Sequence, residues 1–539
     1  MTNINTNELP DKNDVAQRHY DLAMRYHNGD GVPLDCKEAL KNLLIAGEAG
    51  HVGAQYQLGE YYSEGYGDTE IDMPLALRWY EKAAAQGNGD AQASLGSCYM
   101  EGDGVEKNIN KGLQLLQSGM EKGSVLGLTF WATELLSGRF VHQNSEEAIR
   151  LLHIAIEKGG EDVGLAQFGL GISYQMGHGV EQNLDKAAEL LTAATEKMTI
   201  GAQKGNRSKQ SALGISYLNG LGVPEDAAEA VKWFRLAADR GDAISQVELG
   251  QCYLGGTGVS EDPTEAFKWF QKAALQGKDD GQFWLGLCYL SGIGISEDFT
   301  EAARWFLASA EQGNAAAQLH LGRCYLNGIG VSEDITEAVI WFYKAAEQGD
   351  AESQVSMGFA YLGGSGVSQD EHEAAEWFFR AAEQGDPNGQ VQLGYCYLNG
   401  TGVSQNPSEA FQWFNKAAEQ GHAEGENVLG LCYLNGNGVM QNNMRGVMWC
   451  RKAAEQGFAP AQNNMAYFCS EGIGGSKNMQ DAVSWWRLAA DQGDADAQYM
   501  LGICYMEGTG VPKNPAEANK WIRLAAEQGH ENALETLKS

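Results

Sequence analysis

The chain has 539 residues and carries 71 acidic against 38 basic side chains, which gives a formal net charge of −33 at pH 7. This acidity argues against a nucleic-acid backbone or an anionic membrane as partner, and it permits a protein partner with a basic surface. The sequence has no apolar run of about 18 residues, and its first residues are polar. We therefore expect no membrane insertion and no secretory signal. We expect a cytoplasmic location.

A pattern of two helices separated by glycines organises nearly the whole chain. Residues 1–14 are polar and predict a flexible tail. Five degenerate copies of the pattern are expected over 15–206 and nine regular copies over 207–529, followed by a helix at 530–539 that caps the exposed core. The fifth copy is seven residues longer than the norm, near 195–208. This insertion predicts either a second helix longer by two turns or a loop.

One copy, residues 243–278, shows why two helices are expected. Small and apolar residues around Gly250 recur at helical spacing and give the first helix, helix A, one packing face. Glycines then end helix A, because glycine alone adopts left-handed backbone angles cheaply. Asp262, followed by a proline and by Glu265, predicts an N-cap and a capping box for the second helix, helix B, which stops at Gly277. One pair cannot bury both of its faces, so successive pairs must stack.

The anchor glycines lie 36 residues apart from Gly214 to Gly502, with Ala466 once in the same place. The repeated run of Leu-Gly, Tyr, Gly-x-Gly-Val, Asp, Ala, Trp-Phe, Ala-Ala and Gly resembles the Sel1-like repeat, a relative of the tetratricopeptide repeat. The resemblance implies an all-α fold, a right-handed alpha-solenoid superhelix of about fourteen antiparallel helix-pair repeats of 36 residues. It also implies adaptor roles and favours a bacterial origin.

The sequence contains no pattern typical of catalysis, phosphate binding or zinc binding, so we expect no enzyme, no catalytic or metal-ligating residues and no cofactor. Seven of the ten cysteines hold one repeating position, which predicts buried free thiols too far apart for disulfides. A glutamine such as Gln246 recurs in most copies, and we interpret it as a structural bridge to backbone groups of a neighbouring turn.

Positions that differ between copies are the candidate site. They stand one residue after the anchor glycine and two before it, three residues apart on helix A, and so share one face. In tetratricopeptide-like solenoids helix A generally lines the concave groove, as the resemblance implies here. Packing between neighbouring A helices is the alternative at each position. The candidate partner-binding residues are Trp284, Leu287, His320, Arg323, Phe359, Gln392, Tyr395, Leu431 and Tyr467.

The leading functional hypothesis is a non-enzymatic protein-protein interaction scaffold or adaptor, a monomer that binds a protein or peptide in this groove. The alternative is an immunity or inhibitor protein that neutralises a basic bacterial toxin or effector through surface complementarity. A steep salt dependence of complex formation would favour the inhibitor. A third hypothesis, an enzyme or carbohydrate-binding protein, rests only on the family's occasional association with cell-wall material.

Overall fold

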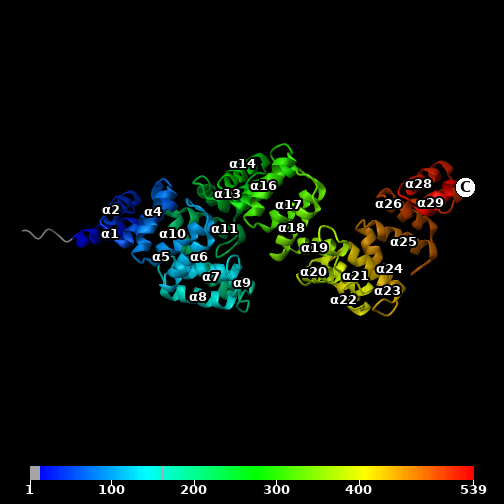
Figure 1. The fold of residues 1–539 in the computed structure, drawn as a ribbon, viewed down its shortest axis with the longest axis horizontal. Coiled ribbons are helices and arrows are strands. Elements are labelled where there is room, and N and C mark those ends of the chain that lie inside the picture. Colours follow the sequence, from blue (N-terminus) through cyan, green and yellow to red (C-terminus); the bar gives the residue numbers. More distant parts are fainter. Residues whose placement is uncertain (1–11, 161, 539) are drawn as a thin grey trace, which may run out of the picture. The chain divides into compact units, whose positions relative to one another are not determined.

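The computed structural model describes residues 12–160 and 162–538. These residues form 29 α-helices and one 3-10 turn, with no strand among them, so the predicted all-α solenoid of helix pairs is confirmed. The chain divides into two compact units, Met1–Glu297 and Asp298–Ser539 (Figure 1). Odd-numbered helices up to α27 are the A helices, and the even-numbered helices that follow them are the B helices.

The helices of the first unit are α1 (Lys12–Asn28), α2 (Cys36–Glu48), α3 (Val52–Glu64), η1 (Tyr66–Asp68), α4 (Met73–Ala85), α5 (Gly89–Glu101), α6 (Ile109–Glu121), α7 (Val125–Ser137), α8 (Ser145–Lys158), α9 (Val163–Met176), α10 (Leu184–Gln203), α11 (Arg207–Asn219), α12 (Ala227–Ala238), α13 (Ala243–Gly255), α14 (Pro263–Leu275) and α15 (Asp279–Ser291). Those of the second unit are α16 (Phe299–Glu311), α17 (Ala315–Asn327), α18 (Ile335–Glu347), α19 (Ala351–Gly363), α20 (Glu371–Glu383), α21 (Pro387–Asn399), α22 (Pro407–Glu419), α23 (Ala423–Asn435), α24 (Asn443–Glu455), α25 (Ala459–Glu471), α26 (Met479–Asp491), α27 (Ala495–Glu507), α28 (Pro515–Glu527) and α29 (Glu531–Lys538).

At the two ends of the chain, α1 begins inside the predicted tail and α29 lies within the predicted cap. Residues 1–11 of the predicted tail lie outside the described residues, and residues 12–14 belong to α1. At the other end, α29 buries Ala533 against Ile522 and Ala525 of α28, while residue 539 of the predicted cap lies outside the described residues. An unpaired helix thus covers apolar surface that the last full pair would expose.

Side-chain caps and glycines set the limits of each helix, as one pair illustrates. The carboxylate of Asp242 caps α13 by accepting from a backbone N–H in the first turn. Gly256, at a φ of +66°, ends α13 in the left-handed region that favours glycine. The carboxylate of Asp262 then accepts two backbone N–H bonds at the start of α14. The predicted N-cap at this position is therefore confirmed.

The second half of the predicted capping box is wrong. The backbone N–H of Asp262 donates to the carbonyl oxygen of Tyr253 at 2.9 Å, so it is not free to bond the Glu265 carboxylate. Glu265 instead forms an ion pair with Lys268, one turn further along the helix, at 2.5 Å. The bond from the cap residue back to helix A closes the turn between the two helices.

The anchor glycine is required by packing within each pair. A Cβ atom on Gly250 would lie 2.5 Å from the ring of Phe270, a separation that real Cβ contacts do not show. Helix A and helix B therefore approach closely at this point, and the fully buried phenyl ring fills the space that a side chain on Gly250 would need. The glycine fixes the distance between the two helices of the pair.

The recurring glutamine links successive pairs. Gln246 is 3% exposed, and its amide donates to the carbonyl oxygen of Ala238, on helix α12, at 3.1 Å. Its side-chain oxygen accepts from the amide of Gln276, which follows α14, at 2.7 Å. One side chain thus joins the end of one B helix to the end of the next, which confirms its interpretation as a structural bridge. The ten cysteines are free and nine are buried, and the seven at the repeating position are all among the buried ones, as predicted.

Candidate functional site

Successive A helices of the second unit pack against one another. Helix α19 contacts α21, α21 contacts α23, and α23 contacts α25, whereas no two successive B helices of this unit, all of which are described, pack to the same extent. We call the surface formed by α17, α19, α21, α23 and α25 the A-helix face.

Seven of the nine predicted site residues lie on the A-helix face. They are His320 and Arg323 on α17, Phe359 on α19, Gln392 and Tyr395 on α21, Leu431 on α23, and Tyr467 on α25. Trp284 and Leu287 lie on α15 and belong to the first unit. Phe359 is 48% exposed and Tyr467 is 54% exposed, while the other seven side chains are half-buried.

Packing accounts for two of the predicted rings. Trp284 stacks on Phe270, with 5.2 Å between the ring centroids, and His320 stacks on Phe306 at the same distance. Burial lowers the pKa of His320, and the neighbouring charge of Arg323 lowers it further. Each of these rings packs on the phenyl ring of the preceding helix B, and not between neighbouring A helices as the packing alternative expects.

Polar contacts between neighbouring A helices account for two more predicted residues. Arg323 forms an ion pair with Glu352 on α19. The hydroxyl of Tyr395 donates to the carboxylate of Glu424 on α23 at 3.4 Å. Burial raises the pKa of Tyr395, and the charge of Glu424 raises it further. Arg323 and Tyr395 therefore join the A helices to one another.

Phe359 and Tyr467 are the aromatic side chains of the predicted set that remain largely open to solvent. The ring of Phe359 meets Phe378 edge-on, with the centroids 5.3 Å apart, and the ring of Tyr467 lies 6.3 Å from that of its neighbour Phe468. About half of each side chain is exposed. The exposed aromatic surface of the predicted site thus reduces to these two residues.

A second candidate site lies in the first unit, where the chain folds back on itself (Figure 1). Residues 204–208, where α10 ends and α11 begins, bond to residues 64–67, which run from the end of α3 into η1. The side-chain amide of Asn206 donates to the hydroxyl of Tyr66 at 2.9 Å, and both side chains are buried. We call this set of contacts the clasp.

Further bonds strengthen the clasp. The carboxylate of Glu64 accepts from both the backbone N–H and the hydroxyl of Ser208, each at 2.9 Å. The guanidinium of Arg240 donates to the backbone carbonyl oxygens of Gly65 and Gly205. The clasp therefore joins the second pair of helices, α3 and α4, to the sixth pair, α11 and α12.

Two departures from the regular period meet at the clasp. Helix α10 has 20 residues, where α14 has 13, so the insertion near 195–208 is a longer helix rather than a loop. The turn η1 follows α3 in the repeat whose step to the next anchor glycine is 37 residues instead of 36. These two irregularities are the sequence signals that could have located the clasp.

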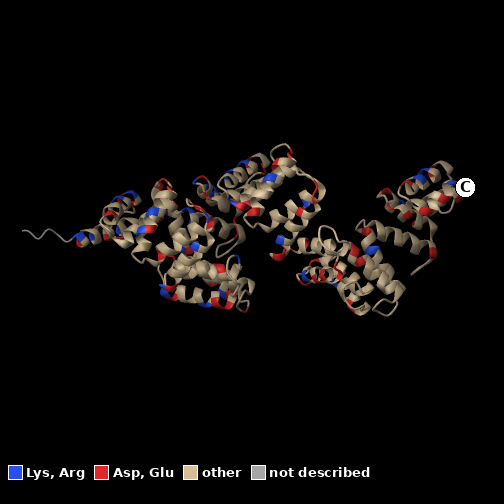
Figure 2. Ribbon diagram, in the orientation of Figure 1, with Lys and Arg blue, Asp and Glu red and all other residues tan. Residues whose placement is uncertain are grey.

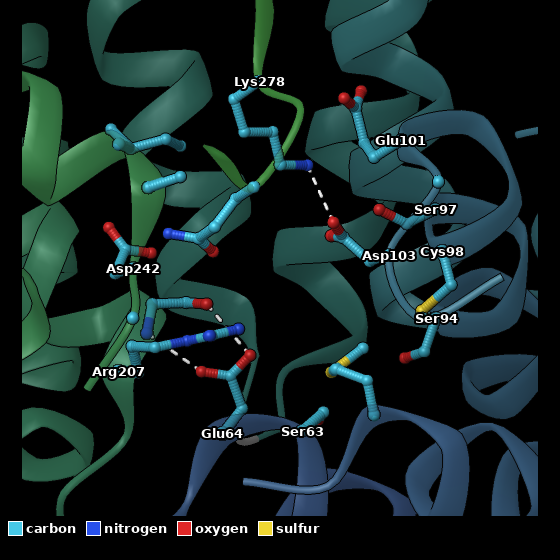
Figure 3. A pocket seen from close by; sticks show the side chains of 18 of the residues that line it. Ser63, Glu64, Ser94, Ser97, Cys98, Glu101, Asp103, Arg207, Asp242 and Lys278 are labelled. Carbon is cyan, nitrogen blue, oxygen red and sulfur yellow. Dashed lines mark hydrogen bonds and ion pairs between the residues drawn. The ribbon is translucent and has the colours of Figure 1, made fainter. Parts of the chain in front are cut away.

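A cavity of about 970 Å³ lies beside the clasp and is lined by residues of α3, α5, α11, α13 and α15 (Figure 3). The ammonium group of Lys278 donates to the carboxylate of Asp103 at 2.7 Å. Arg139 pairs with Glu101, with 3.0 Å between the charged atoms. The lining is therefore strongly charged, and ion pairs connect side chains from different repeats.

Glu60 is the most perturbed carboxyl group of the cavity. It accepts a hydrogen bond from the hydroxyl of Tyr80 at 2.7 Å. Burial raises the pKa of Glu60 to about 8, and the negative charge of Asp162 adds to this effect. The ammonium group of Lys209 lies 3.6 Å from Asp162 and opposes it only in part. The cavity consequently disfavours a further negative charge at this point.

Neither a cluster of metal-ligand residues nor a membrane-spanning helix is found among the described residues. Within residues 12–160 and 162–538, no group of three or more His, Cys, Asp or Glu side chains is placed to hold a metal ion. No helix within these ranges is both long enough and apolar enough to cross a membrane.

Stacked helix pairs with a repeating Leu-Gly anchor and glycine turns define an alpha-solenoid repeat protein. The chain belongs to the Sel1 repeat family, whose model matches fourteen times along it. The number of repeats predicted from the period is therefore confirmed. The matched residues are 19–51, 52–88, 89–124, 127–160, 164–197, 210–242, 243–278, 279–314, 315–350, 351–386, 387–422, 423–458, 459–494 and 495–530.

Similar proteins are known from several bacteria. The crystal structure of a protective antigen present in uropathogenic Escherichia coli strains, displaying an SLR fold, is 32% identical, covers 85% of this chain and 88% of that one, and has a TM-score of 0.54. An uncharacterized protein of Neisseria meningitidis is 25% identical over 232 residues, which are 39% of this chain and 48% of that protein. The chain thus spans about half the length of this curated relative. An immunity protein from Pseudomonas aeruginosa is 20% identical, covers 40% of this chain and 83% of that one, and has a TM-score of 0.31, too distant to bear on function.

Proposed function

We propose that this chain is a non-enzymatic scaffold that binds a protein partner on the A-helix face of its second unit. Sel1 repeat proteins generally mediate protein-protein interaction, which supports the class of function. The observation that carries the finer proposal is the exposure of Phe359 and Tyr467, at 48% and 54%, on A helices that pack against one another.

The environment of these two rings suits an interface. Large aromatic side chains contribute strongly to binding when a partner buries them, because they carry much apolar surface and few rotatable bonds. Arg323 and Tyr395, on α17 and α21, are already held by polar contacts to neighbouring A helices. These polar side chains lie on the same face as the two rings and are already ordered, so little conformational entropy would be lost when a partner binds.

The experiment compares two double variants of the second unit, one that removes exposed aromatic rings from the A helices and one that removes similar rings from the B helices. The test variant is Phe359→Ala with Tyr467→Ala. The control is Tyr343→Ala with Phe379→Ala, which removes rings that are 45% and 40% exposed on the B helices α18 and α20. Partners cross-linked to the purified full chain in a lysate are identified by mass spectrometry, and circular dichroism verifies that both variants are folded.

We expect a partner captured by the wild type to be lost with the A-helix variant and retained with the control. Retention by both variants, or equal loss from both, would remove the A-helix face as the binding surface. The comparison does not require the partner to be known in advance, because the proteins captured by both the wild type and the control are the set against which the A-helix variant is compared.

The second candidate function is an immunity or inhibitor protein for a basic toxin or effector. The observation that favours it is the charge: 71 acidic against 38 basic side chains, with acidic residues spread over the helices of both units (Figure 2). Opposite charge accelerates encounter, and salt screens it. An association rate that falls steeply between low and physiological ionic strength supports the inhibitor, and an insensitive rate supports the scaffold. Both candidates take the chain as a monomer, which light scattering checks.

A further inference from the structure

The cavity of the first unit has the dimensions of a ligand site and is independent of the A-helix face. Its volume of about 970 Å³ is at the upper end of the range of roughly 300–1,000 Å³ in which small-molecule sites fall. The clasp borders it with bonds between segments far apart in the sequence, such as the bond from Asn206, which lines the cavity, to Tyr66. A regular stack of repeats would not enclose such a space, because each pair would contact only its neighbours.

The charge of the lining indicates the sign of the charge that a ligand would carry. Nine carboxyl-bearing side chains but only four basic ones line the cavity. Three of the four basic groups, those of Arg139, Lys209 and Lys278, already pair with carboxylates of the lining. An anionic ligand would therefore meet few uncommitted positive charges and many negative ones. A cationic ligand would relieve the repulsion among the carboxylates.

Among the carboxyl groups of the lining, Glu60 and Glu248 carry no ion pair within the described residues. Glu60, on α3, has only hydroxyl partners: Tyr80 at 2.7 Å and Ser94 at 3.5 Å. Glu248, on α13, is half-buried and faces the same cavity, and the charge of Asp280 adds to the burial that raises its pKa. Each would gain a partner if a positively charged group entered between α3 and α13.

Apolar side chains share the lining with these carboxyl groups. Leu126, Phe130, Leu165, Ile244 and Val247 all line the cavity. A hydrated metal ion would gain nothing from such walls, whereas methylene groups would bury apolar surface against them. The cavity therefore matches a ligand that alternates positive charge with short hydrocarbon segments.

We propose that the cavity of the first unit binds alkylammonium groups, primary amines on methylene chains, with Glu60 and Glu248 as the carboxylates that receive them. A free linear polyamine and the lysine side chains of an unstructured peptide both present this chemistry. Binding to Glu60 would favour its ionised form, and a proton would be released to solvent as the ammonium group enters.

Isothermal titration calorimetry on the full chain tests the proposal with four probes: spermine, a tetralysine peptide, a tetraglutamate peptide and Mg²⁺. We expect one saturable site for spermine or for tetralysine, and the probe that binds identifies the source of the amine. Glu60→Gln and Glu248→Gln, each tested alone, should weaken that site by about tenfold, as expected for the loss of one charge-assisted contact. The tetraglutamate peptide should not bind.

The control is Glu376→Gln with Glu383→Gln, which neutralises exposed carboxylates of α20 and should leave the affinity unchanged. Thermal melts verify that each variant is folded. If Glu60→Gln does not fold, the effect of Glu248→Gln on binding decides the outcome. The proposal is overturned if neither amine gives a saturable site, if the control weakens binding as much as Glu248→Gln, or if Mg²⁺ occupies the same site with the same dependence on these residues.

Discussion

Asn206 and Tyr66 stand 140 residues apart in the sequence and share a buried hydrogen bond of 2.9 Å. The side-chain oxygen of Asn206 also accepts from the backbone N–H of Lys209 at 2.7 Å, which caps α11. The side chain of Asn206 thus caps α11 and also joins two distant segments of the first unit. Contacts in repeat proteins usually join neighbouring repeats, so the free energy of this unit is not a sum over adjacent pairs.

The first prediction concerns this bond. Tyr66→Phe removes the acceptor hydroxyl and leaves the buried amide of Asn206 without that partner, which should cost about 1–3 kcal/mol of stability. Urea unfolding monitored by tryptophan fluorescence measures the loss. Tyr361→Phe, in the second unit, is the control for removing a tyrosine hydroxyl. A loss no larger than that of the control would show that the clasp adds nothing to stability.

The second prediction concerns the anchor glycine. Gly250→Ala places a methyl group 2.5 Å from the ring of Phe270, and this overpacking should cost about 1–3 kcal/mol despite the better helix propensity of alanine. Gly255→Ala is the matched control, since its Cβ would meet only the hydroxyl of Thr257 at 3.4 Å. Thermal denaturation should show destabilisation for the first variant and a small gain, about 0.5 kcal/mol, for the second. Equal effects would mean that the close contact is not limiting.

The third prediction concerns the glutamine bridge. Gln318 donates to the carbonyl oxygen of Ala310 at 3.1 Å and accepts from Gln348 at 2.8 Å. Gln318→Ala should cost about 1–3 kcal/mol, because it leaves buried polar groups without a partner. A double-mutant cycle with Gln348→Ala measures the coupling between the two side chains, which we expect to be about 1 kcal/mol. Strict additivity would rule out a bridge between successive pairs.

The fourth prediction concerns pH. The pKa of Glu60 is raised from its ordinary 4.5 to about 8, so the folded chain retains a proton that the unfolded chain releases. The stability from this group is present below about pH 4.5 and is lost as the pH rises through about 8. Tyr80 from α4, Glu64 from α3, Asp162 before α9 and Lys209 from α11 face the carboxyl group.

A Glu60→Gln variant lacks this titration. The stability of the wild type relative to that of the variant should therefore fall steadily from pH 5 to pH 8, as measured by urea unfolding at fixed ionic strength. A relative stability that stays constant, or that rises with pH, would contradict the burial of this carboxyl group.

The fifth prediction concerns thiol reactivity. Burial raises the pKa of Cys288 to about 12, whereas Cys469 is the one cysteine that is only partly buried. Because the thiolate is the reacting form, Cys469 should react first with Ellman's reagent in the native protein, and Cys288 only after denaturation. Peptide mapping after brief alkylation identifies the labelled residue. Rapid reaction of Cys288 would show that the core of its repeat opens readily.

The helix pairs could be predicted from the sequence because every local signal repeats with the apolar pattern. The cap at Asp262 and the close approach at Gly250 both follow from residue types at fixed spacing. The capping box failed because a tertiary bond, from Asp262 to Tyr253, competes with the local one. The family resemblance and the period agree on the number of repeats, as the fourteen family matches show.

The candidate site was less predictable. Phe359 and Trp284 stand at variable positions of the same helix face, yet Phe359 is largely exposed while Trp284 stacks on Phe270. Trp284 stands two residues before the anchor glycine and stacks on the preceding helix B, whereas Phe359 stands one residue after it and meets the ring of the following helix B edge-on. How much of each ring these contacts cover depends on packing in three dimensions, which residue types alone do not specify. The two irregular repeat lengths mark the repeats of the clasp, but they do not predict that these repeats meet, because small rotations between successive pairs accumulate before α11 returns to α3.

The clasp sets a condition on the gain and loss of whole repeats. In the second unit, inserting or deleting one 36-residue copy only lengthens or shortens the stack. Between Tyr66 and Asn206 the same event would carry one partner beyond the reach of the other and open the cavity. Duplication and deletion can therefore change the number of repeats in the second unit. In the first unit, the number of repeats between Tyr66 and Asn206 must stay the same for the clasp to form.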